Sequence, residues 1–204
     1  MRVDGEGATT FAGQDYSREP PSVEAPWVGL RFVECRFVGA DLIELNTVRC
    51  VFDRCSFDGA RLNAGSHQES AFLNCTFEGA NLFETAFRGC KMTGSRFAGA
   101  TWHGARIEGG DWSYASMPSA RWSGQNLRGI NLQEADLVGA DLRRANLRDA
   151  RLARAQLEGA RLAGADLRGA DLQGVNMRSL ELLGVKLDIE QAVAIVRSLG
   201  ALVE

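Results

Sequence analysis

The sequence predicts an all-β fold, a four-sided solenoid of about eight coils that ends in a C-terminal capping helix. Three observations lead to this prediction. A hydrophobic residue recurs at every fifth position, a small residue stands two positions before it, and similar strings of residues return after 20 positions. Neither the 3.6-residue period of a helix nor the two-residue period of a flat strand produces this pattern.

The five-residue period runs from Phe32 to Leu187. It samples 32 central positions, and only Thr47 and His67 among them are not hydrophobic. Because 45% of the chain is hydrophobic, chance would give about 14 hydrophobic residues at these positions. Alanine is the usual residue two places earlier, as at Ala40. A chain that turns a corner after each unit would direct the central and small residues inward and the other three outward.

The 20-residue period sets the number of units in a coil. Strings such as FVGADL and FEGANL return at this spacing, and they place phenylalanine at Phe37, Phe57, Phe77 and Phe97. Four units therefore form one coil, 32 units form eight coils, and like side chains stack on like in interior columns. Parallel coils should lie about 4.8 Å apart, as hydrogen-bonded strands do.

The chain divides into three predicted segments. Residues 1–26 form an N-terminal segment, residues 27–187 the solenoid, and residues 188–204 the C-terminal helix and tail. Phe11 in the first segment lies 21 residues before Phe32, one residue out of frame. Two interpretations of this segment stay open, one out-of-frame extra coil and a flexible acidic tail.

The C-terminal segment has the signals of a helix. Asp188 followed by Gln191 predicts a capping-box start, and Gly200 marks the end. One apolar face can cover the last coil, which protects the solenoid against end-to-end stacking, and another apolar face remains. We expect that remaining face to form a homodimer. The predicted interface residues are Ile189, Ala192, Val193, Val196 and Leu199.

The sequence predicts no catalytic residues, no cofactor and no metal site. A solenoid filled by side chains offers no concave pocket in which a nucleophile and a base could meet. His67 takes a central position and is expected to be a hydrogen-bonded core residue, whereas His103 points outward. All five cysteines take the small inward position, where free cysteine behaves as a small buried hydrophobe. They are Cys35, Cys50, Cys55, Cys75 and Cys90.

The charged residues occupy the outward positions. These positions carry 19 acids and 20 bases, so the surface is close to neutral. Arg88, Arg128, Arg148 and Arg168 form one column, which Glu108 interrupts. Aspartates that precede a central leucine are expected to bond nearby backbone at turns. They are Asp41, Asp136, Asp141, Asp166 and Asp171.

Several features bear on where the protein acts. The first ten residues lack the basic start and apolar core of a secretory signal, and no apolar run approaches the length of a membrane span. An odd number of cysteines suits a reducing compartment. We therefore expect a cytoplasmic protein that has no membrane partner.

The A-[D/N/R]-[L/F]-x-x register resembles the pentapeptide-repeat proteins over residues 30 to 187. Two segments, Ser66 to Phe77 and Leu187 to Gly200, resemble the gyrase-interacting MfpA/Qnr group of that family. The resemblance implies a right-handed quadrilateral β-helix and a homodimer that binds DNA gyrase or a related type II topoisomerase. It also implies that the protein protects the enzyme from a quinolone or a natural-product inhibitor as a rod that mimics DNA, without binding nucleic acid directly.

The balanced surface departs from that group, because a neutral rod would compete poorly for a surface that neutralises phosphates. The alternative function is a non-catalytic structural or protein-interaction scaffold whose partner is unknown. The C-terminal segment favours the gyrase-binding prediction, and the balance of surface charge favours the scaffold.

Overall fold

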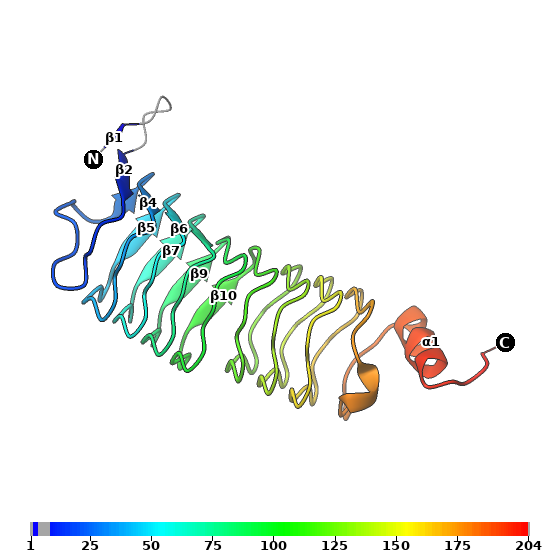
Figure 1. The fold of residues 1–204 in the computed structure, drawn as a ribbon. Helices are drawn as coiled ribbons and strands as arrows, with labels where there is room; N and C mark the ends of the chain where they lie inside the picture. Colours follow the sequence, from blue (N-terminus) through cyan, green and yellow to red (C-terminus); the bar gives the residue numbers. More distant parts are fainter. Residues whose placement is uncertain (1, 4–8, 204) are drawn as a thin grey trace. The chain divides into compact units, whose positions relative to one another are not determined.

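The computed structural model describes residues 2–3 and 9–203, and its contacts divide the chain into two units, Met1–Ser116 and Met117–Glu204. Both units are built from coils whose backbones pair in parallel with a 20-residue offset (Figure 1). The predicted parallel β-solenoid with a C-terminal helix is confirmed in this architecture.

Unit 1 contains two five-stranded sheets. One has the order β1-β2-β4-β6-β8 and the other the order β10-β9-β7-β5-β3. All neighbours pair in parallel except β1 and β2, which are antiparallel. The strands are β1 (Arg2–Val3), β2 (Thr9–Ala12), β3 (Trp27–Val28), β4 (Arg31–Val33), β5 (Asn46–Val48), β6 (Val51–Asp53), β7 (Ser66–Gln68), β8 (Ala71–Leu73), β9 (Ala86–Arg88) and β10 (Arg106–Glu108).

The corners repeat one backbone conformation. In most units the carbonyl of the central residue accepts a hydrogen bond from the amide three residues later, as from Ala40 to Phe37 at 3.1 Å. The intervening Gly39 has a φ of 66°, the positive value that the third residue of a type II turn requires. Glutamate, arginine and other residues adopt the same conformation at equivalent positions, for example Glu44 at 59°. The sharp turn every five residues is therefore a property of the backbone register.

Stacked side chains fill the interior of unit 1. The rings of Phe32 and Phe52 stack with centroids 5.0 Å apart, and Phe72 continues the stack at 4.7 Å. A second stack runs through Phe37 and Phe57 at 4.8 Å. All of these rings are buried. Register between coils thus places identical rings in parallel contact, which adds to the hydrophobic effect of burying them.

Residues 9–16 at the N-terminal side of unit 1 pair as a coil does. Phe11 lies in register with Phe32, despite their 21-residue separation, and the two rings stack at 4.9 Å. Asp15 forms a parallel bridge with Arg36. Residues 1 and 4–8 of the predicted N-terminal segment lie outside the described residues.

Unit 2 has shorter parallel bridges in place of strands, and leucine fills most of its central positions, with Met117, Trp122 and Met177 as the others. The fully buried central residues include Leu127, Leu132, Leu137, Leu142 and Leu147. The last bridge joins Asp166 and Lys186. The helices in the described part of unit 2 are a 3-10 turn, η1 (Met177–Ser179), within the segment between these two residues, and α1 (Ile189–Ser198), which follows it.

Helix α1 begins with the predicted capping box. The Asp188 carboxylate accepts from the Gln191 amide at 2.8 Å, and the Gln191 side chain accepts from the Asp188 amide at 3.0 Å. Both side chains also satisfy the last coil. Asp188 accepts from the Gly169 amide at 2.9 Å, and Gln191 Nε2 donates to the carbonyls of Leu167 and Ala170 at 2.6 and 2.8 Å. In earlier coils the groups equivalent to the Gly169 amide and the Ala170 carbonyl bond the next coil, so here the helix cap takes the place of that coil.

Candidate interaction surfaces

The interior of unit 1 contains a polar cluster whose side chains are buried and hydrogen-bonded to one another. His67 is 1% exposed, and its Nδ1 lies 2.9 Å from Thr47 Oγ1. Thr47 Oγ1 lies 2.9 Å from Ser70 Oγ, which accepts from the Cys50 amide. Burial lowers the pKa of His67 to about 3, so the ring is neutral near pH 7. The prediction that His67 is a hydrogen-bonded core residue is confirmed.

The cysteines are also core residues. All five are free and buried, as predicted. Cys50 and Cys90 each donate from Sγ to a carbonyl of the preceding coil at 3.2 Å. Burial raises the pKa of the Cys90 thiol to about 11. A protonated thiol without solvent access is a poor nucleophile.

The polar surface residues serve the turns. Each of the five aspartates predicted to bond nearby backbone accepts from the amide two residues later, at 3.0 to 3.4 Å. Among the residues that the structure describes, no group of three or more His, Cys, Asp or Glu side chains could hold a metal ion.

Helix α1 presents an apolar face to solvent. Gln191 and Ile195 are its buried residues. The five predicted interface residues fall elsewhere on the helix: Val193 is half-buried, whereas Ile189, Ala192, Val196 and Leu199 are exposed, Ile189 by 82%. A groove of about 430 Å³ lies between the helix and the last coil, lined by Leu172, Val175, Met177, Ala194, Ile195 and neighbouring residues. The sequence did not indicate this groove, because its walls come from an incomplete coil.

The charges differ between the two units. Unit 1 has 11 Lys and Arg against 15 Asp and Glu, a net charge of −4, whereas unit 2 has 12 against 11. Ion pairs between successive coils use many of these groups, as in Arg54 with Glu34 at 2.9 Å and Arg61 with Asp41 at 3.2 Å. Such exposed pairs contribute little to stability, but they lower the charge that a partner meets.

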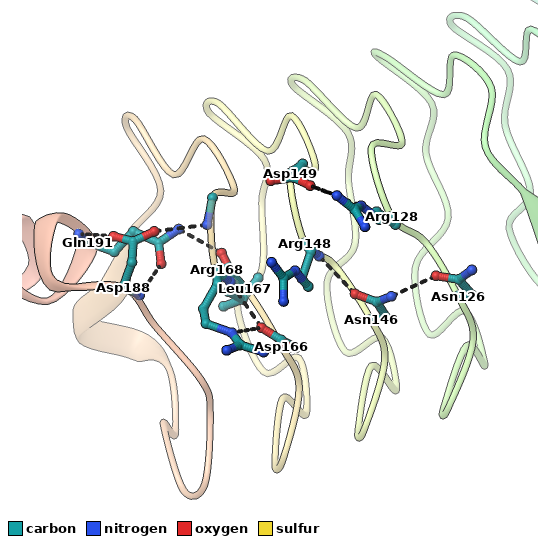
Figure 2. A network of polar contacts seen from close by, with 11 residues as sticks. Asn126, Arg128, Asn146, Arg148, Asp149, Asp166, Leu167, Arg168, Asp188 and Gln191 are labelled. Carbon is teal, nitrogen blue, oxygen red and sulfur yellow. Dashed lines mark hydrogen bonds and ion pairs between the residues drawn. The ribbon is translucent and has the colours of Figure 1, made fainter.

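One face of unit 2 collects arginines. We define the arginine face as the outward residues around Leu127, Leu147 and Leu167, several of which Figure 2 labels, together with Arg144 and Arg151, which lie just before and just after the unit of Leu147. Arg128 pairs with Asp149 at 2.9 Å, and Arg168 pairs with Asp166 at 2.6 Å. The Arg168 guanidinium lowers the pKa of the Asp166 carboxyl to about 2. The arginines of this face are Arg128, Arg144, Arg148, Arg151 and Arg168.

Comparison with known proteins places this geometry in context. The chain matches the family model described as pentapeptide repeats, with eight copies over residues 32–64, 68–99, 126–162 and 155–188. It is similar to the pentapeptide repeat protein MfpA of Mycobacterium tuberculosis, with 39% identity over 61 residues, 30% of this chain. The match covers only 33% of MfpA, so the chain spans about a third of that relative's length.

Two solved structures share the fold. A trypsin-treated variant of QnrB1, a plasmid-mediated fluoroquinolone resistance protein, has a TM-score of 0.82 at 24% identity, covering 97% of this chain and 98% of its own. HetL is a pentapeptide repeat protein involved in heterocyst differentiation regulation in the cyanobacterium Nostoc sp. strain PCC 7120. It has a TM-score of 0.53 at 21% identity, with 87% and 84% covered.

Proposed function

Because the chain belongs to the pentapeptide-repeat family, we propose that it is a non-catalytic protein that binds DNA gyrase or a related type II topoisomerase and protects it from inhibitors. The observation that carries this proposal is the similarity to MfpA and to QnrB1, a fluoroquinolone resistance protein. The filled interior, in which His67 and the cysteines are buried, supports a role that depends on surfaces.

A specific observation favours a second candidate function, a structural or protein-interaction scaffold. Protection by electrostatic mimicry of DNA needs a strongly acidic surface, and the net charge of this chain is only −3. Unit 1 has more acidic residues than unit 2, and its Glu44, Glu69 and Glu84 lie at exposed corners. Binding to a topoisomerase would therefore depend on shape and on local acidic patches of unit 1.

The gyrase proposal is tested by supercoiling assays in the presence of a fluoroquinolone. We expect increasing protein to relieve poisoning of the cleavage complex, and to do so with only a weak dependence on salt between about 50 and 150 mM, because few charges are neutralised. Reactions without the drug separate protection from direct inhibition. If the protein neither protects nor inhibits at any concentration, the scaffold function is favoured, and protection that vanishes at the higher salt would show that charge dominates.

We further propose that the protein is a homodimer through the exposed face of α1. Ile189→Asp should convert the dimer to a monomer at tens of micromolar, because a carboxylate would have to be desolvated in the interface. Val138→Asp, on a turn of unit 2 and 40% exposed, is the matched control and should leave the mass unchanged. Light scattering measures both, and a wild-type monomer at these concentrations would contradict the proposal.

A further inference from the structure

Of the arginines on the arginine face, Arg144, Arg148 and Arg151 form no ion pair in the described structure, and Arg148 is the half-buried one of the three. Among the described residues, Arg148 has no ion pair, and its buried Nε has no hydrogen-bond partner. A desolvated guanidinium N–H without an acceptor is costly. We propose that Arg148, with Arg144 and Arg151 on the same coil, binds a carboxylate of an acidic segment in a protein partner.

Comparison with the other arginines shows which carboxylate is missing. Where an aspartate stands directly before the central leucine of a unit and an arginine directly after it, the two side chains form a bidentate pair. Arg143 bonds Asp141 through Nε and Nη2 at 2.7 Å each, and Arg168 bonds Asp166 at 2.8 and 2.6 Å. Arg148 has Asn146 in that place. The Asn146 side chain instead donates to Asn126 Oδ1 and accepts from the backbone amide of Arg148.

Arg148 also lacks the second kind of ion pair found on this face, which joins an arginine to an aspartate of the next coil. Arg128, which likewise follows an asparagine, uses Asp149 of the next coil at 2.9 Å. The position that corresponds for Arg148 is Gly169. The charge of Arg148 helps to lower the pKa of Asp166, but the hydrogen bonds of the nearby carboxylates go to other groups: both oxygens of Asp166 bond Arg168, and Asp188 caps the helix and the Gly169 amide. Figure 2 shows Arg148 between the pair of Arg128 with Asp149 and the pair of Arg168 with Asp166.

The distribution of free charge favours a carboxylate over a nucleic-acid backbone. Arg144, at the corner before Arg148, and Arg151, just past the corner at Asp149, are exposed, and the described structure gives neither an ion pair. On the same face, the arginines of the coils on either side, Arg128 and Arg168, are paired with aspartates. The unpaired arginines of the arginine face thus lie on one coil, whereas a phosphate backbone is bound by a row of contacts along its length. Planar bidentate pairing is what a guanidinium offers a carboxylate.

The proposal is tested by fluorescence polarisation of the full chain with a labelled oligoglutamate peptide of about eight residues, at about 50 and 150 mM salt. We expect Arg148→Gln to weaken binding about tenfold. Asn146→Asp should weaken it by a similar factor, although it removes no arginine, because the new carboxylate would pair with Arg148 as Asp166 pairs with Arg168. The matched control is Arg161→Gln, which removes the same charge from unit 2 while Asp141 keeps Arg143; binding should change less than about twofold.

Thermal unfolding establishes that each variant is folded, and Asn146→Asp should be at least as stable as the natural chain. Failure of the natural chain to bind the peptide would overturn the proposal. So would unchanged binding by Asn146→Asp, or equal losses in Arg148→Gln and Arg161→Gln, since those results would mean diffuse attraction. A short DNA duplex is the second probe. If it binds more tightly than the peptide and depends on Arg148, the surface recognises nucleic acid and the proposal is wrong.

Discussion

Replacement of Phe52 by alanine is expected to lower the free energy of unfolding by about 3 to 5 kcal/mol. The Phe52 ring is fully buried and stacks on Phe32 and Phe72 with centroids 5.0 and 4.7 Å away. Its removal leaves a cavity inside a stack whose neighbours are fixed by backbone pairing on both sides. The coils cannot close that gap, because their spacing is set by hydrogen bonds.

Phe83→Ala is the matched control, since it deletes the same ring from an outward position. Phe83 is 38% exposed and contacts the ring of His103 at 5.7 Å. We expect a loss of about 1 kcal/mol or less. Urea unfolding of the two variants measures the difference, and similar losses at both positions would mean that the assignment of inward and outward positions is wrong.

The solenoid itself could be predicted from the sequence, because one residue in five carries most of the information. A central residue such as Leu142 is buried because its position in the unit points inward, and the parallel register gives the residues 20 positions away the same environment. The small inward positions differ in how much space each one offers to a side chain, which the pattern does not indicate. Gly110 stands where alanine is usual, but a Cβ there would overlap the carbonyl oxygen of Cys90, and the residue has a φ of 97°. A strict repeat gives no signal of that local close approach.

The candidate surfaces could be predicted only in part. The free face of the helix followed from apolar residues that exceed what one covered face needs, as Ile189 and Val196 illustrate. The second role of Gln191, as a hydrogen-bond donor to two carbonyls of the last coil, depends on where the helix packs and has no sequence signal. The lack of an ion pair at Arg148 does have a sequence signal. Asn146 and Gly169 interrupt positions where aspartate pairs the neighbouring arginines, and comparing units on one face would have located it.

Acidification is expected to destabilise the protein through His67. The ring is neutral in the folded state, where burial lowers its pKa to about 3, whereas an unfolded histidine titrates near 6.5. Below pH 6.5 the unfolded state therefore binds a proton that the folded state refuses. Stability is complete above that pH and falls by about 1.4 kcal/mol for each pH unit toward 3, a loss of about 2 kcal/mol at pH 5.

The surroundings of His67 support this assignment. It stacks on Phe87 at 5.1 Å and meets the edge of Phe72, and its hydrogen-bond chain consists of the neutral hydroxyls of Thr47 and Ser70. No carboxylate in the described structure is in contact with the ring to stabilise an imidazolium. The paired carboxylates of Asp141 and Asp166 stop stabilising the folded state only at lower pH, because their pKa values lie below the ordinary value of 3.8.

The measurement is urea unfolding at pH 7 and pH 5 for the natural chain, His67→Phe and His103→Phe. His67→Phe places a ring in the same stack and removes the titrating group, so its stability should change by less than about 0.5 kcal/mol between the two pH values. His103→Phe, at an exposed position, should retain the full loss of about 2 kcal/mol. If all three proteins lose the same free energy on acidification, His67 is not the group responsible, because a buried imidazole that stays neutral must make the natural chain more acid-sensitive than His67→Phe.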